Sequence, residues 1–330
     1  MRGSLRWIHR SHQTECFAFL TISFGLTWIV WIPLLLSSRT HEQLGDLLFI
    51  GTFGPSVAAV LLSYRGVRTP GSELSARLAC FSVTLLLCWA VLVAHAGLWD
   101  EVRLSFGSKL LLLLPSAIPA WIVSTAFSRD AGIRATVRSL LIPMPIVWHL
   151  VALFMFPALL VFAATVTRIQ GGALPQLRVA GSGLSYAVLV IVEFGYAFFV
   201  GGGVSEEPGW RGFLLPRLQD RFNPLVASLL IWFPWALWHA PLDFVGYAGS
   251  TFGAYLRTRV FILVPLCIII TWAYNRCRRT ILSAALFHSA FNVAPDFIPS
   301  TEWAVWMISM LALVVIVTDR MWQPIREEKL

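Results

Sequence analysis

Charged side chains are scarce in this sequence. Asp, Glu, Lys and Arg make up 13% of its 330 residues, whereas hydrophobic residues make up 57%. Soluble domains carry roughly a quarter charged residues, and no polar stretch here is long enough to form a separate soluble domain. The composition therefore predicts an all-α, polytopic transmembrane helical bundle rather than the two soluble domains that the length alone would allow.

The sequence also lacks the local signatures of several enzyme classes. It contains no Gly-x-Ser-x-Gly elbow, no His-Glu-x-x-His zinc motif and no glycine-rich phosphate-binding loop. The cysteines show no metal-ligand spacing, so we expect them to be buried free thiols. They are Cys16, Cys80, Cys88, Cys267 and Cys277.

Basic residues are unevenly distributed between the loops. The net charge is +8, but Lys and Arg occur in small sets between apolar runs, which is typical of membrane orientation rather than nucleic-acid binding. Loops on the side of the N-terminus hold 18 of the 25 Lys and Arg residues, and the opposite loops hold 7. This asymmetry predicts that both termini lie in the cytoplasm.

The apolar segments predict about ten membrane spans, with eight as the lower bound, because each span needs roughly twenty apolar residues. The predicted spans are residues 16–37, 46–63, 78–97, 110–127, 146–167, 184–203, 224–246, 260–275, 281–297 and 302–318. The first run is too long for a signal-peptide core and lacks a small-residue cleavage site. We divide the chain into N-terminal spans of unassigned role (1–183), a core segment that holds the polar clusters described below (184–297), and a last span with a cytoplasmic tail (298–330).

A run of three glycines, Gly201-Gly202-Gly203, ends the sixth span. Glycine is unfavourable inside helices, so we expect the helix to break here, with Ser205 as the N-cap of a new helix. Pro208 is tolerated in the first turn of that helix. The new helix covers an amphipathic stretch at 205–221, between the sixth and seventh spans.

Two adjacent carboxylates, Glu206 and Glu207, stand at the start of this helix. Arg211 lies four residues beyond Glu207 on the same helical face and is its predicted partner. Glu206 points about 100° around the helix and remains free for chemistry. Charged groups near lipid are costly and indicate a functional site by default. The alternative is that the acidic pair only anchors an interfacial helix.

Two histidines in later spans have polar companions at helical spacing. His239 lies in the seventh span, with Asp243 one turn later, and His288 lies in the ninth span, with Asn292 one turn later. A histidine without such a companion is expected to be a hydrogen-bonded packing residue. Three polar residues of other spans stand alone in this way and are predicted to be structural: His95, His149 and Glu193.

Helix geometry allows these polar groups to meet. If the chain reverses near Phe222-Asn223, Glu206 and His239 each lie about sixteen residues from the turn, or about 24 Å along antiparallel helices. His288 lies about 13 Å past the preceding basic loop, and a hairpin tip that projects about 10 Å would bring all three to one depth. A carboxylate and an imidazole can then deprotonate a water for attack on a carbonyl. A neighbouring His and Asn can stabilise the resulting oxyanion.

Three segments of the sequence resemble the motifs of a known family. SEEPGWRGFLL, WALWHAP and FHSAFN occur in this order over about residues 184–297. They resemble the CPBP family, which includes CAAX prenyl endopeptidases (Rce1-like) and bacteriocin-processing, or Abi, membrane proteases. The resemblance implies an intramembrane endopeptidase whose site opens toward the cytosol. By matching position, it implies Glu206 as the general base, His239 as a partner that shares the water, and Glu207 with Arg211 as an orienting pair.

The same resemblance implies that His288 and Asn292 line the oxyanion side of the site. Asp243, four residues after the first motif histidine, stands where the prenyl-protease branch has Asn. Asp cannot donate a hydrogen bond unless it is protonated, so an oxyanion role for this position is in doubt. Trp235 stands where Phe is common, which is a conservative change. The first 180 residues resemble no named family.

These observations predict an endopeptidase of the inner (plasma) membrane that acts on a membrane-associated peptide or protein substrate and binds no nucleic acid. No cofactor is expected, although a Glu/His cluster could hold Zn²⁺ in a zinc-dependent version of the same protease. Two other classes stay open, namely a non-catalytic bacteriocin-immunity or scaffold protein, and a transporter whose buried charges form a path. The sequence indicates neither the identity of the substrate nor the oligomeric state.

Overall fold

The computed structural model describes residues 2–37, 48–68, 74–99, 101–177, 183–245 and 251–325. Within these ranges the regular secondary structure is helical, and the only β-type contact is an isolated bridge between Arg68 and Asp130. The prediction of an all-α fold is confirmed.

Long apolar helices alternate with short helical segments along the described chain. The α-helices are α1 (Arg2–Leu35), α3 (Gly54–Leu62), α4 (Leu74–Leu98), α5 (Phe106–Leu111), α6 (Leu113–Ser124), α7 (Ala131–Val137), α8 (Ile146–Ile169), α9 (Gly183–Phe199), α10 (Gly203–Glu207), α11 (Leu215–Gln219), α12 (Pro224–Trp238), α13 (Ala240–Val245), α14 (Phe252–Thr258), α15 (Val264–Arg276), α16 (Ile281–Phe297) and α17 (Glu302–Thr318). Two 3-10 turns and two π-helical segments adjoin them: η1 (Thr125–Phe127), η2 (Arg138–Leu141), η3 (Pro208–Leu214) and η4 (Arg259–Leu263).

Several of these helices are long and apolar enough to cross a membrane. Six helical stretches of the described chain meet that condition: His12–Leu35, Leu74–Leu98, Phe106–Phe127, Ile146–Ile169, Gly183–Gln219 and Phe252–Arg276. Shorter apolar helices cover Leu48–Leu62, Pro224–Trp238 and Glu302–Thr318, and α16 covers the ninth predicted span. Within the described residues, each predicted span therefore falls on one or more helical segments. The number of crossings and the side on which the termini lie stay predictions.

The outer helices expose large apolar side chains. On α4, Leu78, Val83, Leu86 and Leu87 are each more than half exposed. Only 22% of the most apolar window of α4 is buried inside the protein, and α8 shows the same share. Soluble proteins rarely expose apolar areas of this size, whereas a helix that faces lipid must do so. These faces fit the hydrocarbon interior of a membrane.

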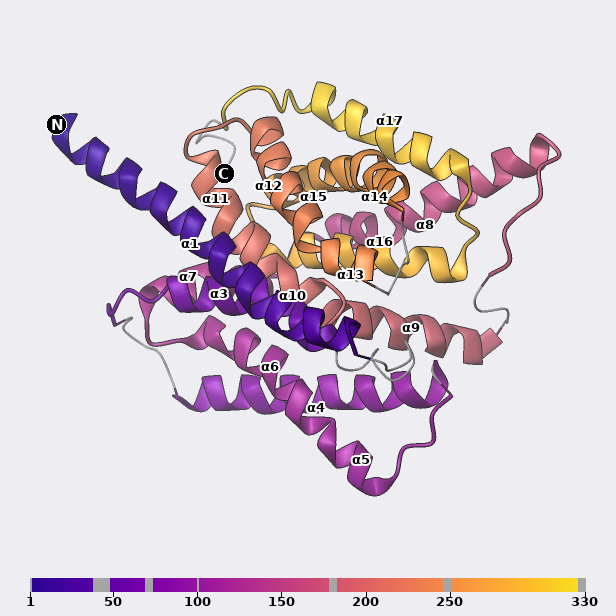
Figure 1. Ribbon diagram of the computed structural model, residues 1–330, viewed down its shortest axis with the longest axis horizontal. Helices are drawn as coiled ribbons and strands as arrows, with labels where there is room; N and C mark the ends of the chain where they lie inside the picture. Colours follow the sequence, from indigo (N-terminus) through magenta and orange to yellow (C-terminus); the bar gives the residue numbers. More distant parts are fainter. Residues whose placement is uncertain are drawn as a thin grey trace.

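The inner helices approach one another closely at glycines. A Cβ atom on Gly54 of α3 would lie 2.2 Å from the Thr27 Oγ1 of α1, and one on Gly209 of η3 would lie 2.6 Å from Pro55 of α3. Small residues at such crossings let membrane helices pack backbone to backbone. In Figure 1, α3 and α10 lie between α4 and α6 on one side and α15, α16 and α17 on the other. The short helix α10 is therefore at the centre of the bundle, in contact with α3, α9 and α16.

Many of the basic loops meet at one end of the bundle, which we call the basic end. It comprises residues 12–15, 63–68, 128–141, 217–224, 276–281 and 319–321. Glu15 accepts hydrogen bonds from Arg65 (2.9 Å) and Arg217 (2.7 Å), which ties α1 to two of these loops. Leu225 donates its backbone N–H to the Met321 carbonyl (3.1 Å), which joins the start of α12 to the chain after α17.

A buried carboxylate, Asp130, organises one loop of the basic end. It accepts backbone hydrogen bonds from Arg65, Gly132 and Ile133 at 3.0 to 3.2 Å. Burial by itself would raise the pKa of Asp130, but these backbone hydrogen bonds outweigh it and lower the pKa below its ordinary value. The ionised side chain therefore caps α7 and stabilises the folded loop.

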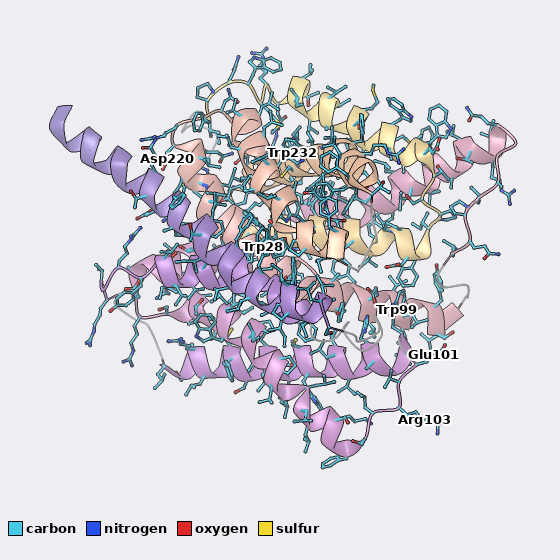
Figure 2. All side chains as sticks on the ribbon, in the orientation of Figure 1. Trp28, Trp99, Glu101, Arg103, Asp220 and Trp232 are labelled. Carbon is cyan, nitrogen blue, oxygen red and sulfur yellow. The ribbon has the colours of Figure 1, made fainter. Side chains whose placement is uncertain are left out.

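The other end of the bundle, which we call the opposite end, comprises residues 99, 101–109, 168–177, 183–186 and 297–303. Trp303 donates to the Gln170 side chain (2.9 Å), and the Tyr186 hydroxyl donates to the Phe297 carbonyl (3.0 Å). Figure 2 places Asp220 of the basic end far from Trp99, Glu101 and Arg103 of the opposite end. The described loops named above thus lie at two ends of the bundle, and the assignment of these ends to the sides of the membrane stays a prediction.

Candidate active site

The helix breaks at the glycine run, as predicted. Helix α9 ends at Phe199 and α10 begins at Gly203. The φ angle of Gly202 is +126°, and a Cβ atom there would lie 2.5 Å from the Cε1 of His288. Only glycine can adopt this backbone conformation readily and also leave room for the imidazole, because it has no Cβ atom. The break therefore brings the backbone of Gly202 against the ring of His288.

The predicted N-cap, Ser205, is wrong by three residues. Gly202 occupies the cap position, and Ser205 lies inside the first turn of α10. The Ser205 hydroxyl accepts the Gly202 N–H (3.0 Å) and donates to the Val200 carbonyl (3.1 Å). The chain turns at the positive φ of Gly202, so the helix starts earlier than a serine cap would allow, and the serine reaches back to secure the turn.

The segment at 205–221 was predicted to be an amphipathic helix, with interfacial anchoring as one alternative. Its first half is instead buried at the centre of the protein, because Trp210, Phe213 and Leu215 are fully buried. Arg211 is 0% exposed although it carries a charge. Glu206, Glu207 and Arg211 therefore face protein rather than an interface, so the alternative that the acidic pair only anchors an interfacial helix is wrong.

Glu207, Arg211 and His288 form one buried network. The Arg211 Nη1 donates to the Glu207 Oε1 (2.9 Å), and the His288 Nδ1 donates to the same oxygen (2.8 Å). The side chains of Glu207 and Arg211 are both 0% exposed. The Arg211 guanidinium also lies over the Trp235 ring, 4.7 Å from its centroid, and contacts the Cys267 Sγ at 3.5 Å. The predicted pairing of Glu207 with Arg211 is present, and it fixes one nitrogen of His288.

Glu206 points away from this network and is held by two indoles. The Trp235 Nε1 donates to the Glu206 Oε2 (2.7 Å), and the Trp210 Nε1 donates to the same oxygen (3.3 Å). Glu206 is only 4% exposed. Among the described residues, its other oxygen, Oε1, accepts no hydrogen bond from protein. The carboxylate is thus fixed at one oxygen, while the second is left for a reacting partner.

His239 ends α12 beside the same indole. Its Nδ1 lies 2.8 Å from the Trp235 carbonyl oxygen, which can only accept, so Nδ1 carries the hydrogen. The neutral ring then has its free lone pair on Nε2. The Trp238 ring packs edge-on against the imidazole at 4.7 Å between centroids. These contacts select the tautomer of His239 and hold its orientation.

Asn292 lies one turn beyond His288 on α16 and contacts the glycine run. Its Nδ2 donates to the Gly201 carbonyl (2.7 Å). The same amide nitrogen carries a second hydrogen that this bond does not use. Unlike His288, which is buried, Asn292 is exposed. The pair therefore reaches from the buried network to an accessible surface.

A cavity of about 500 Å³ brings these groups together. Glu206, His239, His288 and Asn292 all line it, and the remaining walls come largely from α1, the 48–52 segment, α9 and α15. Glu207 and Arg211 do not line the cavity and lie behind His288. The structure thus unites four of the predicted site residues around one space, with the other two as buried support.

The comparisons with known proteins fit this arrangement. Residues 187–294 match the family described as type II CAAX prenyl endopeptidase, Rce1-like, and all six predicted site residues fall within this range. Residues 187–294 form an Rce1-like domain. The chain is also 28% identical over 209 residues to CAAX prenyl protease 2 of Methanococcus maripaludis. The aligned region covers 59% of this chain and 75% of that relative. The family match supports an intramembrane protease.

The sequence did not indicate two residues that build the site of the Rce1-like domain. Trp210 lies four residues after Glu206, at helical spacing, and that spacing could have suggested a contact. Arg259 lines the cavity and pairs with Asp243, although sixteen residues separate them in the chain. Asp243, considered above for the oxyanion, is instead the partner of a cation. No local sequence pattern links Asp243 with Arg259.

The polar residues predicted to be structural do not line the 500 Å³ cavity. The His95 Nε2 is 3.0 Å from the Glu193 Oε2, so these two, which stand alone in sequence, face each other between α4 and α9. The His95 ring stacks on Tyr196, a cavity-wall residue, at 3.9 Å between centroids. His149 is half-buried, with its Nδ1 3.4 Å from the Pro145 carbonyl oxygen. The two residues of this pair come from different helices, so helical spacing in the sequence could not indicate their contact.

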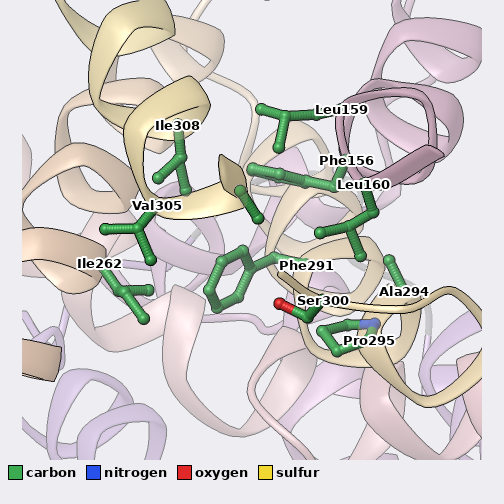
Figure 3. A pocket seen from close by; sticks show the side chains of 11 residues that line it. Phe156, Leu159, Leu160, Ile262, Phe291, Ala294, Pro295, Ser300, Val305 and Ile308 are labelled. Atoms are coloured by element: carbon green, nitrogen blue, oxygen red, sulfur yellow. The ribbon is translucent and has the colours of Figure 1, made fainter. Parts of the chain in front are cut away.

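A second, apolar cavity of about 120 Å³ lies beside the Rce1-like site (Figure 3). Phe156 and Leu160 of α8, Val305 and Ile308 of α17, and Phe291 of α16 line it. Phe291 also lines the catalytic cavity, so one aromatic ring adjoins both spaces. The small cavity offers an apolar surface next to the polar groups.

The described residues contain no group of three His, Cys, Asp or Glu side chains placed to hold a metal ion. Glu206 and the two site histidines have other partners at the atoms discussed above, namely indole N–H groups, a carbonyl and a carboxylate. The donor set of a usual zinc site, four ligands or three ligands with a water, is therefore not assembled among these residues.

Proposed function

We propose that this protein is an endopeptidase in which Glu206 activates a water for attack on a peptide bond. The observation that supports this most is the cavity itself, where Glu206, His239 and His288 face one space within an otherwise apolar bundle. Intramembrane ionisable groups that converge on a cavity are functional by default. The family match gives the reaction class, and the geometry suggests the roles.

The proposed reaction begins with a water between the Glu206 Oε1 and the His239 Nε2. Glu206 takes one proton from this water, while the remaining O–H donates a hydrogen bond to the His239 Nε2, and the oxygen attacks the peptide carbonyl carbon. Asn292, through its unused amide hydrogen, and His288, as an imidazolium that donates from Nε2, stabilise the oxyanion of the tetrahedral intermediate. When the intermediate collapses, the C–N bond breaks and Glu206 gives its proton to the leaving amine.

Glu207 and Arg211 act in this proposal as positioning residues. Their ion pair is fully buried, and Glu207 holds the Nδ1 of His288 at 2.8 Å. A ring that is fixed at one nitrogen presents the other nitrogen in a constant direction. Neither residue touches the substrate in this scheme.

The proposed protease needs no metal, because the carboxylate and the imidazole activate the water themselves. Chelator treatment should leave cleavage unchanged. Loss of cleavage with a chelator, and its recovery with added Zn²⁺, would favour the zinc-dependent version. The same purified protein serves for both measurements.

The substrate class follows from the site's surroundings and from the relative's name. The cavity lies among membrane-length helices, so the substrate is a membrane-associated peptide or protein, and we place the enzyme in the inner (plasma) membrane. The relative is named for CAAX prenyl substrates, which suggests a bond near a C-terminus. The apolar cavity beside Phe291 would accommodate an apolar part of such a substrate.

The test is cleavage of a set of membrane peptides by the purified protein in lipid nanodiscs, with products identified by mass spectrometry. The variants are Glu206→Gln and, as a matched control, Glu302→Gln, whose carboxylate is exposed in the first turn of α17. Loss of a general base should slow cleavage by about 10²–10⁴-fold, while the control cleaves like the wild type.

Three other outcomes would contradict the proposal, each in a different way. Cleavage by Glu206→Gln at the wild-type rate would remove this residue from the chemistry. Peptide binding without cleavage by any form would indicate the scaffold alternative. Movement of a solute across the membrane without proteolysis would indicate the transporter alternative.

A further inference from the structure

One cation lines the catalytic cavity and takes no part in the proposed reaction. Among the described residues of the cavity wall, Arg259 is the only Lys or Arg. It begins the π-helical segment η4, and such segments are frequent at functional sites. An ionisable group inside a membrane bundle indicates a function by default. The position of Arg259 in the wall therefore raises the question of what its guanidinium binds.

Aromatic side chains hold Arg259 in place. The Trp232 Nε1 donates to the Arg259 carbonyl (2.6 Å), which fixes the backbone. The guanidinium carbon lies 5.5 Å from the centroid of the Tyr255 ring, and the Tyr255 hydroxyl donates to the Ala236 carbonyl of α12 (3.0 Å). His239 ends the same helix. The cation therefore has a constant position relative to a proposed catalytic residue.

The hydrogen-bonding capacity of the guanidinium is only partly used. Its Nη2 donates to the Asp243 Oδ2, and the side chains of Arg259 and Asp243 are 14% and 12% exposed. The Nε is buried and has no partner among the described residues, and Nη1 donates no hydrogen bond to them either. Arginine carries five N–H donors in a planar fork that suits a carboxylate. Donors for a second carboxylate therefore remain on this side chain.

The catalytic carboxylate is not that second partner. Two indoles hold Glu206, and no ion pair joins it to Arg259 among the described residues. Stability does not explain the cation either, because replacing a buried ion pair by apolar residues of similar volume is often neutral. Asp243 does not line the cavity, whereas Arg259 does, so the pair presents its positive member to a bound molecule. These observations favour an anionic ligand.

We propose that Arg259 is a specificity-determining residue, which binds a carboxylate of the substrate while Glu206 activates the attacking water. The α-carboxylate at the C-terminus of a polypeptide and the side chain of Asp or Glu present the same group. Either can accept hydrogen bonds from the unused donors of the guanidinium. A carboxylate held at one fixed point of the cavity determines which peptide bond reaches Glu206. The inference rests on the proposed function, because it assigns a role within the same cavity.

The test measures the binding of fluorescent peptides to the protein in lipid nanodiscs. The probes are dansyl-Ala-Leu-Leu-Ala with a free C-terminus, the same peptide as a C-terminal amide, and the C-terminal amide of dansyl-Ala-Leu-Glu-Ala. Every form of the protein carries Glu206→Gln, so that cleavage does not interfere, and this parent is compared with the form that also carries Arg259→Gln. The matched control is Arg257→Gln, because Arg257 is exposed and does not line the cavity.

We expect the parent to bind the free acid at least about tenfold more tightly than the amide, because a hydrogen bond to a charged group contributes more than one between neutral groups. Arg259→Gln should bring the two affinities together, and Arg257→Gln should leave their ratio as in the parent. Equal or undetectable binding of acid and amide by the parent would overturn the proposal. A preference for the acid that survives Arg259→Gln would overturn it as well.

The third probe identifies the source of the carboxylate. If the amide that contains glutamate binds as tightly as the free acid, and loses this affinity in Arg259→Gln, the site accepts any carboxylate of the substrate. If it binds as weakly as the other amide, the site is specific for the C-terminal carboxylate. Both results support a carboxylate site at Arg259.

A second variant keeps the test decisive if Arg259→Gln fails to fold. Asp243→Asn replaces the carboxylate that competes for the guanidinium by a neutral amide, so the preference for the acid over the amide should increase. An ion pair with a purely structural role would instead change the binding of both probes equally. A preference that stays constant or decreases in Asp243→Asn would therefore overturn the proposal.

Binding needs no catalysis, so the proposed mechanism and the role of Arg259 can fail separately. Cleavage by Glu206→Gln at the wild-type rate would overturn the mechanism and leave a preference for the acid intact. A missing preference, together with cleavage that still depends on Glu206, would overturn only the role of Arg259.

Discussion

The buried pair of Glu207 and Arg211 allows the sharpest stability prediction. Both side chains are 0% exposed, and their N–O distance is 2.9 Å. Removing either partner leaves an uncompensated charge in the protein interior, which costs about 3–5 kcal/mol. We therefore expect Glu207→Gln and Arg211→Met each to lower the free energy of unfolding by about this amount.

The double variant Glu207→Gln/Arg211→Met removes both charges together. Replacing a buried ion pair by neutral groups of similar volume is often close to neutral. The glutamine side chain introduced by Glu207→Gln also keeps an oxygen that can accept from His288. We expect the double variant to lose no more than about 3–5 kcal/mol, well below the sum of the two single losses.

Reversible unfolding in mixed micelles, with increasing denaturing detergent, measures these free energies. Arg276→Met is the matched control, because Arg276 forms an ion pair with Asp319 but its side chain is 53% exposed. A pair this exposed contributes about 0–1 kcal/mol. If the two single losses at Glu207 and Arg211 simply add in the double variant, the buried pair is not an energetic unit and our reading of the network is wrong.

Three further predictions concern separate parts of the molecule. Gly202→Ala introduces a Cβ atom 2.5 Å from the His288 ring at a positive φ, so it should cost about 1–3 kcal/mol and lower cleavage at least tenfold. Asp243→Asn leaves the Arg259 guanidinium without its carboxylate and should lower the unfolding free energy by about 1.5–3 kcal/mol. The pKa of Asp130 is lowered in the folded protein, so ionised Asp130 stabilises the fold at pH values above its ordinary pKa of 3.8, and this stabilisation is lost as the pH falls through the folded pKa. In Asp130→Asn, the part of the fall in melting temperature at acidic pH that Asp130 causes should be absent.

The first two of these predictions have a control variant. A Cβ atom on Gly97 of α4 meets nothing within 4 Å, so Gly97→Ala should leave both stability and cleavage intact. Arg257 is exposed and lies outside the cavity, so Arg257→Gln should change stability by less than about 0.5 kcal/mol. Equal effects of Gly97→Ala and Gly202→Ala would contradict the steric argument. An unchanged acid response in Asp130→Asn would contradict the capping role.

The sequence predicted the parts of this structure that repeat a simple physical rule. Apolar runs of membrane length became helices, and the glycine run broke the helix before Glu206. The spacing of four residues between Glu207 and Arg211 placed them on one face of a helix, and their ion pair followed. Depth along antiparallel helices was enough to bring Glu206 and His239 to one cavity.

The remaining features depend on contacts that no local pattern encodes. Arg259 reaches Asp243 from another helix, and Glu193 meets His95 across nearly a hundred residues of chain. The burial of the segment after Glu206 could not be inferred from its composition, because an internal ion pair neutralises its charges and other helices cover it. Ser205 was misplaced as a cap because the positive φ of Gly202 is a tertiary constraint, set by the ring of His288.

The most direct test of the central claim is a single turnover of a cleaved membrane peptide in water labelled with heavy oxygen. Our account predicts that the wild-type protein adds one labelled oxygen to the new carboxyl terminus, with no covalent enzyme adduct, and that Glu206→Gln forms the labelled product about 10²–10⁴-fold more slowly. Full cleavage by the folded Glu206→Gln variant, or a trapped acyl-enzyme in the wild type, would contradict the claim that Glu206 activates water.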